Sequence, residues 1–275
     1  MQKKIFHLIT AIVLVLFVTS CQKMDKPELG VYPVDGNPPG GPLKFYAAFD
    51  APNNPVDSIR ALFGTTKNAT LNSGGTSGNC LQFTNNGYGL FPSANDFGGS
   101  TSFTISFWMN ITLAQKDNSH AVGVMAYANT DAFWSNIVFY IDNNTKSPSD
   151  SMDLKIHFSD GTGDNWNFAG YNFANAWPKM YNGVWHQVAF TYDAVAKVGT
   201  VYRDGVQFDR KTGQSIKFNK PSQLVVGGFQ QAAGVQGDYA GNSWMAGFAG
   251  KLDNLRLYAT ALSAAEVLAL YNNKQ

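Results

Sequence analysis

The stretch WHQVAFTYD at residues 185–193 alternates larger apolar side chains with small or polar ones, which is the period of a β-strand with one face in a core. The segment VYRDGV follows at residues 201–206. Its Asp204-Gly205 pair favours a hairpin, because Asp-Gly readily adopts the positive φ angles of a type I′ turn. The two segments therefore predict antiparallel strands.

Short runs with the same period recur along the chain, and clusters of Asn, Gly, Asp and Ser separate them. The other predicted strands are residues 43–49, 103–109, 136–141, 154–158, 223–226 and 252–258. A helix is predicted only near the end, where Ser263 and Glu266 form a capping box before an apolar run. The body of the chain, about residues 43–275, thus suits one all-β domain.

The composition excludes several classes of protein. The chain has 275 residues, of which 14% are charged and 14% aromatic, so it is neither disordered nor a coiled coil. Only Glu28 and Glu266 are glutamates, and Glu is a good helix former, so a helix-rich fold is not expected. The formal net charge of +1 gives no strong field that would favour nucleic acid, and no nucleic-acid partner is predicted.

The N-terminus has the organisation of a signal peptide. Two lysines precede an apolar core at residues 8–18, which is too short for a comfortable membrane span. The following VTSC at residues 18–21 resembles the box of bacterial lipoproteins, in which the Cys is diacylated and becomes the new N-terminus. We therefore expect a signal peptide at residues 1–20 and a lipid on Cys21. The alternative is a plain secretory signal with an incidental Cys.

Residues 21–42 contain five prolines and four glycines and predict a semi-extended tether between the lipidated Cys21 and a domain at residues 43–275. The lipoprotein resemblance implies a lipid-anchored protein of the cell envelope, in the outer membrane of a Gram-negative bacterium, with the lipid as its contact with the membrane. If Cys21 carries lipid, only Cys80 remains, so no intrachain disulfide is expected.

Five motifs resemble, in order, the strands of laminin-G-like jelly-roll domains. They are YAAFD at 46–50, FTISFW at 103–108, WHQVAFTYD at 185–193, VYRDG at 201–205 and FAGKLDNLRLY at 248–258. The resemblance implies the concanavalin A-like lectin/glucanase fold, a jelly-roll sandwich of two curved antiparallel sheets, with a short C-terminal helix. This fold carries lectins, glycosidases and adhesion modules, so it does not fix the function.

Glycoside hydrolysis needs two carboxylates across the scissile bond, and glucanases of this fold place theirs as Glu-x-Asp-x-(x)-Glu on one strand. No Glu lies between residues 29 and 265, so that motif is absent and we predict that the chain is not an enzyme. An Asp-dependent glycoside hydrolase is the alternative. Its nearest cluster is Asp153, Asp160 and Asp164, although residues 160–164 read as a turn.

A structural calcium is one candidate site. Asp253 shares a strand face with Leu255 and Leu257, and a buried carboxylate there needs a cation or several N–H donors. In the resembling family an Asp of this closing strand often ligates calcium, which implies Asp253 and, with it, Asp50 as metal ligands. The alternative is that Asp253 caps a loop by accepting backbone N–H groups.

A carbohydrate-binding surface is the other candidate. Exposed aromatic side chains beside Asn, Asp and Gln suit the apolar faces and hydroxyl rims of sugars. Trp134, Trp166, Trp177 and Trp244 each lie among polar residues that read as loops, where the alternative role is anchoring the loop to the sandwich. We interpret the chain as a non-catalytic carbohydrate-binding lipoprotein that helps to capture a glycan or polysaccharide. A protein-interaction or adhesion module is the alternative from a different class.

Overall fold

The computed structural model describes residues 40–142, 150–159, 164–168, 176–237 and 239–274. The predicted signal peptide, Cys21 and the tether up to residue 39 lie outside the described residues. Gly40–Gln275 group into one compact unit. Within the described part of the chain, no helix is long and apolar enough to cross a bilayer.

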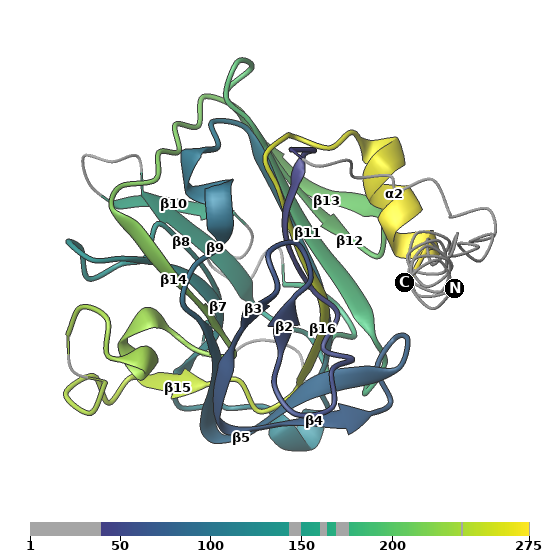
Figure 1. The fold of residues 1–275 in the computed structure, drawn as a ribbon, viewed down its shortest axis with the longest axis vertical. Coiled ribbons are helices and arrows are strands. Elements are labelled where there is room, and N and C mark those ends of the chain that lie inside the picture. Colours follow the sequence, from purple (N-terminus) through teal and green to yellow (C-terminus); the bar gives the residue numbers. More distant parts are fainter. Residues whose placement is uncertain (1–39, 143–149, 160–163, 169–175, 238, 275) are drawn as a thin grey trace, which may run out of the picture. The chain divides into compact units, whose positions relative to one another are not determined.

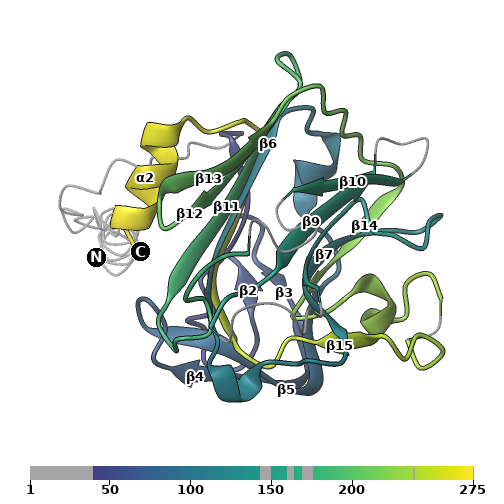
Figure 2. The same cartoon turned by 180° about the vertical axis from the view of Figure 1, so that it is seen from behind.

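Eleven strands pair in one continuous path that folds over into two layers, because β5 pairs with both β14 and β16 (Figures 1 and 2). The first layer consists of β10 (Asp164–Phe168), β9 (Leu154–Ser159), β8 (Ile137–Ile141), β7 (Ala121–Asn129), β14 (Pro221–Val226) and β5 (Asn79–Phe91). The second consists of β16 (Lys251–Tyr258), β6 (Phe103–Asn110), β11 (His186–Asp193), β12 (Val198–Arg203) and β13 (Val206–Lys211). The predicted antiparallel jelly-roll sandwich is confirmed.

Further short strands extend the layers. β1 (Leu43–Ala47) pairs with β16, β4 (Thr65–Ser73) pairs with β5, and β15 (Met245–Gly247) pairs in parallel with β7. β2 (Val56–Asp57) and β3 (Leu62–Phe63) form a separate two-stranded ribbon. The one parallel pair among these places the start of β15 beside the start of β7, at Met245 and Ala121.

Aromatic side chains fill the space between the two layers. Phe107 of β6 meets Phe139 of β8 edge to face, with ring centroids 5.3 Å apart. The predicted alternation of β11 is observed, since Val188 and Phe190 lie in this core while Ala189 faces the other side of the sheet. Edge-to-face pairs add stability beyond burial alone, so this contact helps to hold the two sheets together.

The outer face of the second layer is covered by the helix α2 (Ala264–Asn272), which begins at the predicted capping box of Ser263 and Glu266. Trp108 projects from β6 to this outer face with Thr104 and Ser106. Its ring is buried and stacks on Tyr271 of α2 at 5.5 Å. Packing against α2 therefore explains why Trp108 is buried although it lies on the face of β6 that carries polar side chains.

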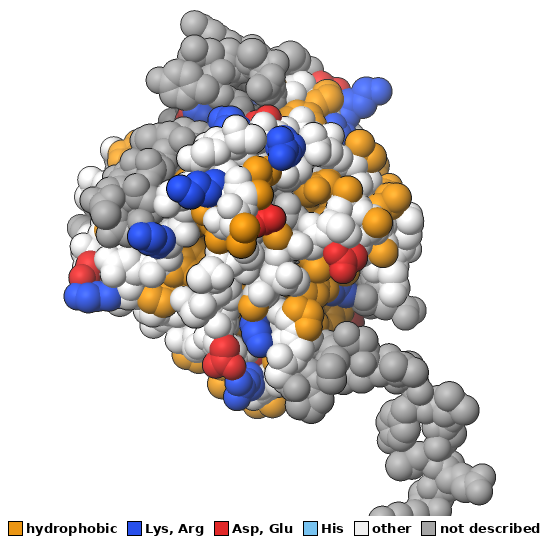
Figure 3. Space-filling view, turned by 90° about the horizontal axis from the view of Figure 1, so that it is seen from above, with side chains coloured by type: hydrophobic (Ala, Val, Ile, Leu, Met, Phe, Trp, Pro, Cys, Tyr) orange, Lys and Arg blue, Asp and Glu red, His pale blue; other side chains and the backbone are white. Residues whose placement is uncertain are grey.

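The outer face of the first layer is also buried. Val138, Tyr140 and Val225 form an apolar cluster there, on the opposite side of the sheet from the main core. Two connections cover it, residues 130–136 between β7 and β8 and residues 227–244 between β14 and β15, and they lie side by side in both views (Figures 1 and 2). By contrast, the end of the domain drawn in Figure 3 carries isolated basic and acidic side chains among apolar and neutral ones, with no region of a single charge.

Candidate functional site

Three aromatic side chains on these covering loops form what we call the aromatic surface: Phe133, Trp134 and Trp244. The ring centroid of Trp134 lies 5.6 Å from that of Phe133 and 5.9 Å from that of Trp244. Phe133 and Trp244 leave 38% and 40% of their surface exposed to solvent, whereas Trp134 is half-buried between them and the sheet. Two of the four tryptophans singled out in the sequence are thus brought together.

A buried glutamine joins the two loops that carry the aromatic surface. The side-chain Oε1 of Gln230 accepts a hydrogen bond from the backbone N–H of Asn129 at 2.8 Å. Its Nε2 donates to the carbonyl oxygens of Ala132 at 2.8 Å and Phe133 at 3.0 Å, and Gln231 donates to the same Phe133 carbonyl at 2.6 Å. Because buried backbone groups need partners, this amide clamp fixes the loop of Trp134 against the loop of Trp244.

Trp134 rests on a histidine of the sheet beneath it. The rings of Trp134 and His157 of β9 stack at 4.6 Å with an angle of 15° between their planes. His157 is fully buried, and burial lowers the pKa of its ring to about 4. The imidazole is therefore neutral at neutral pH and gives Trp134 a flat, uncharged support.

Charged side chains flank this support on the same face. Lys155 pairs with Asp142 and lies 3.7 Å from the carboxylate of Asp153. Burial raises the pKa of Asp153 to about 7. The positive charge of Lys155 opposes this rise in pKa, and the negative charge of Asp142 adds to it. Asp153 is nearly inaccessible to solvent, and the side chains of Asp160 and Asp164 lie outside the described part of the chain.

The other two predicted tryptophans have different places. Trp177 is fully buried and stacks on Phe208 of β13 at 4.5 Å, so its prediction as an exposed platform is wrong. The backbone N–H and the carbonyl oxygen of Trp177 both form hydrogen bonds with the backbone of Met152. These bonds satisfy the backbone polar groups of a segment that the sequence predicts to be a loop. Trp166 belongs to β10, opposite His157, rather than to a loop, and its side chain lies outside the described residues.

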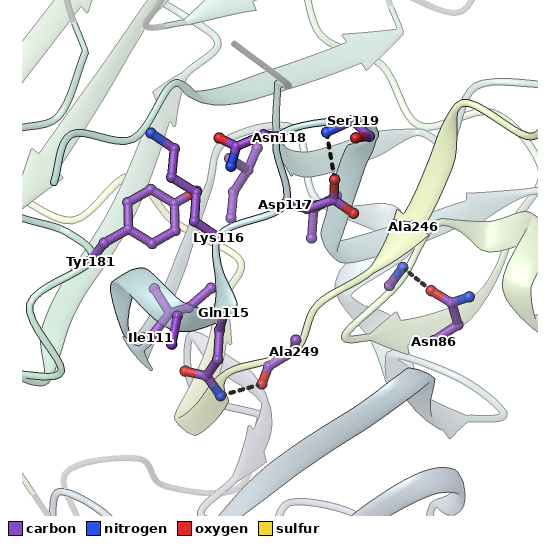
Figure 4. Close-up of a pocket in the computed structure, with 14 residues that line it drawn as sticks. Asn86, Ile111, Gln115, Lys116, Asp117, Asn118, Ser119, Tyr181, Ala246 and Ala249 are labelled. Atoms are coloured by element: carbon purple, nitrogen blue, oxygen red, sulfur yellow. Dashed lines mark hydrogen bonds between the residues drawn. The ribbon is translucent and has the colours of Figure 1, made fainter. Parts of the chain in front are cut away.

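A pocket of about 590 Å³ opens beside β15 (Figure 4). We call it the polar pocket, because the polar side chains of residues 115–119, in the β6–β7 connection, form much of its rim. In Figure 4, Lys116 lies along Tyr181, and Gln115 donates a hydrogen bond to the Ala249 carbonyl oxygen at 2.7 Å. The residues of this pocket are spread from position 86 to position 249, which is why sequence reasoning missed it.

The two predicted metal ligands lie around one glycine-rich loop. Asp253 is fully buried, and its Oδ2 accepts hydrogen bonds from the backbone N–H of Thr76 at 2.6 Å and from the Thr76 hydroxyl at 2.8 Å. Asp50 is exposed and accepts from the backbone N–H of Asn79 at 2.7 Å. Asp253 thus makes the loop-capping contacts that were the alternative to metal ligation.

The same loop also offers the oxygen ligands that calcium prefers. A Cβ on Gly75 would lie 2.7 Å from Oδ2 of Asp253 and 2.2 Å from the carbonyl oxygen of Asn79, and one on Gly78 would lie 2.2 Å from Oδ1 of Asp50. Burial raises the pKa of Asp253 to about 6, Thr76 and Asn254 oppose the shift, and the charge of Asp50 adds to it. The two carboxylates thus approach different glycines of the loop, and among the described residues no group of three or more His, Cys, Asp or Glu side chains that could hold a metal ion is found.

A family model described as the concanavalin A-like lectin/glucanases superfamily, of the laminin G type, matches residues 83–268. A comparison with curated protein sequences finds no match. The matched residues include every strand from β6 to β16 and both loops of the aromatic surface.

Solved structures share the fold at low sequence identity. Domain 4 of the extracellular arabinanase AbnA from Geobacillus stearothermophilus, solved with arabinotriose, has a TM-score of 0.55 at 18% identity, over 84% of this chain and 98% of that one. The binding domain of botulinum neurotoxin DC with rat synaptotagmin II has 0.58 at 11%, over 86% and 53%. Trypanosoma rangeli sialidase with the inhibitor DANA has 0.56 at 14%, over 84% and 32%. This chain thus spans about half of the toxin chain and a third of the sialidase.

Replacing the clamp should loosen the aromatic surface. Gln230→Leu leaves the Asn129 N–H and the Ala132 carbonyl oxygen without this partner, while the Phe133 carbonyl oxygen keeps its hydrogen bond from Gln231. Each unsatisfied buried group costs about 1–3 kcal/mol. We expect the free energy of unfolding to fall by about 3 kcal/mol in urea titrations, with a red shift of tryptophan fluorescence in the native state. Gln207→Leu on the exposed face of β13 is the matched control. Equal stability of the two variants would show that the clamp contributes nothing.

Proposed function

Because this chain belongs to the concanavalin A-like lectin/glucanase superfamily, we propose that it binds carbohydrate through the aromatic surface and does not cleave it. Structural neighbours of the chain include an arabinanase domain that was solved with arabinotriose. The observation that carries the proposal is the pairing of Trp134 and Trp244, which presents aromatic faces to solvent on a rigid support. Sugars bring apolar C–H faces to such rings, and the neighbouring amide and hydroxyl groups suit their rims.

The fixed geometry of the surface favours binding. Gln230 joins the loops and His157 supports Trp134, so little conformational freedom remains to be lost when a ligand docks. Three acidic groups on this side of the sheet or in its loops have basic partners, since Asp142 pairs with Lys155, Asp153 is buried beside the same ammonium, and Asp131 pairs with Lys220. These contacts favour a surface that holds a glycan over a carboxylate pair that cuts one.

A protein-interaction module is the second candidate. One neighbour of the same fold, the botulinum neurotoxin DC binding domain, was solved in complex with a protein, rat synaptotagmin II. The two candidates differ in one observable, which is retention on polysaccharide.

The full chain should be retained on at least one member of a polysaccharide panel of linear arabinan, laminarin, starch, galactomannan and polygalacturonate. Trp244→Ala should weaken this binding at least tenfold in affinity electrophoresis, because a large aromatic side chain of a binding surface carries much of the binding energy. The control is Phe63→Ala, which removes an exposed ring from β3. If no polysaccharide retains the chain, the protein-interaction candidate replaces this proposal.

Attachment to the cell envelope through Cys21 is part of the proposal, because a tethered binder raises the local concentration of glycan at the membrane. We place the protein at the outer membrane of a Gram-negative bacterium on the resemblance of VTSC at residues 18–21 to a lipoprotein box.

The chain expressed in a Gram-negative host should incorporate labelled palmitate and fractionate with membranes. Cys21→Ala should lose both properties, whereas the matched control Cys80→Ala should keep them, because the thiol of Cys80 is buried in the folded domain. Labelling that persists in Cys21→Ala would contradict the anchor.

A structural calcium held by Asp253 and Asp50, with the Asn79 carbonyl as a further ligand, is the remaining part of the proposal. The ion would neutralise two carboxylates around the glycine loop and so stabilise the edge of the sandwich near β4 and β5. Asp253 would enter such a site in its ionised form.

The sign of the pH effect follows from the raised pKa of Asp253. Without metal, the pKa of Asp253 rises from 3.8 to about 6 when the chain folds. The protonated carboxyl therefore stabilises the native state in full below pH 4, and this contribution is lost as the pH rises through 6. Bound calcium compensates the ionised carboxylate. The rise in melting temperature on adding calcium to chelator-treated protein should therefore be larger at pH 8 than at pH 5. Asp253→Asn should lose the rise, and Asp96→Asn, an exposed carboxyl paired with Arg60, should keep it. No calcium-dependent shift in the wild type would remove the metal from the proposal.

A further inference from the structure

The polar pocket is closed on its inner side by the core of the sandwich. Val122 of β7, Ile141 of β8 and Ala246 of β15 line it, and all three belong to the apolar cluster between the sheets. A ligand can therefore enter from the solvent side but cannot pass through. At about 590 Å³ the pocket lies within the range of roughly 300–1,000 Å³ typical of small-molecule sites.

The rim of the pocket carries one positively and one negatively charged side chain, Lys116 and Asp117. Lys116 holds its ammonium 5.3 Å from the centre of the Tyr181 ring. Asp117 accepts hydrogen bonds from the backbone N–H groups of Ser119 at 2.7 Å and His120 at 3.0 Å, and its other oxygen contacts the His120 ring at 2.8 Å. Burial acts to raise the pKa of Asp117, but these hydrogen bonds outweigh it and hold the pKa below its usual value.

The charges of the lining therefore cancel. Of the fourteen residues around the pocket, Lys116 and Asp117 alone are charged at neutral pH, and they are adjacent in the chain. The side chain of Asn86 uses its Oδ1 to accept the Gly247 N–H at 2.9 Å, which leaves its amide nitrogen as a donor at the rim. An apolar floor under a neutral, amide-bearing rim matches an uncharged molecule with one apolar face and many hydroxyls.

The pocket adjoins the aromatic surface. Trp244 immediately precedes β15, whose Ala246 and Gly247 line the pocket, so the Cα atoms of Trp244 and Ala246 lie about 7 Å apart along an extended backbone. The ring of Trp244 packs on the outer face of the sheet, with Phe229, and Ala246 packs on the inner face. The carbonyl oxygen of Trp244 also accepts the N–H of Ala121 at 2.8 Å, which fixes Trp244 at the start of the strand that carries Val122.

We propose that the polar pocket holds the terminal sugar of a neutral glycan whose following units lie on the aromatic surface. This inference rests on the proposed function and adds to it the recognition of a chain end. A blind pocket accepts an end or a branch, whereas the aromatic surface alone would accept the interior of a chain. The lining has no net charge, because Lys116 and Asp117 cancel, and this favours neutral sugars over uronic acids.

The test uses Asn118→Trp, because Asn118 lines the pocket and its side chain is exposed, so an indole there narrows the mouth without entering the core. Val195→Trp is the matched control, since it places the same ring on the β11–β12 turn, where Val195 is 95% exposed. Both are prepared as full chains. The probes are linear arabinan, laminarin and galactomannan, each intact and after partial hydrolysis that multiplies chain ends at constant mass, and polygalacturonate treated in the same way.

Wild type and Val195→Trp should bind a hydrolysed neutral polysaccharide at least tenfold more tightly per unit mass than the intact one. Asn118→Trp should lose this gain while keeping its retention on the intact chain through Trp244. Equal binding of hydrolysed material by Asn118→Trp and wild type, or a gain that appears only with polygalacturonate, overturns the inference and leaves the proposed function standing. Failure of the wild type to bind any of these probes overturns this inference, and failure to bind starch as well overturns the proposed function too.

Discussion

The hydrogen bonds of one buried amide, Gln230, determine what this jelly roll can present to solvent. The first layer of the sandwich is apolar on both faces, so its outer face needs a cover, and two loops far apart in sequence provide it. Loop backbones carry polar groups that cannot be buried without partners. Gln230 satisfies one N–H and two carbonyl oxygens at the point where these loops meet, and the aromatic surface forms above it.

The hydrogen bonds of Gln230 hold the aromatic surface in a fixed geometry that suits ligand binding. Trp134 is held between its partners and the neutral ring of His157, and Trp244 is held by the backbone of β7, so the exposed faces are fixed before any ligand arrives. A preorganised apolar face with polar neighbours is suited to holding a sugar ring. Asp142 and Asp153 lie beside Lys155, and Asp131 of the Trp134 loop pairs with Lys220, which agrees with the proposal of binding without cleavage. The calcium that we propose at the loop of Asp253 would add stability to this arrangement, and the sugar that we propose in the polar pocket would add selectivity.

The sequence predicts well where one face of a strand is apolar and the other polar, as in β11, and where a capping box starts a helix. It fails at β7 (Ala121–Asn129), because that strand is buried on both faces and shows no alternation. Trp134 and Trp244 are identified from their polar neighbours, but the same reasoning misplaces Trp177, whose backbone partners lie elsewhere in the chain. Gln230 has no local signal at all, since its partners are about 100 residues away.

The most direct measurement is a titration of the ¹⁵N-labelled full chain with an oligosaccharide of the polysaccharide that retains it, followed through the six tryptophan indole N–H signals. Binding at the aromatic surface predicts that the signals of Trp134 and Trp244 shift with the same dissociation constant, while those of the buried Trp108 and Trp177 stay in place. Binding that leaves the Trp244 signal unchanged, or that shifts only the signal of Trp185 on another part of the domain, would contradict a glycan site on this surface.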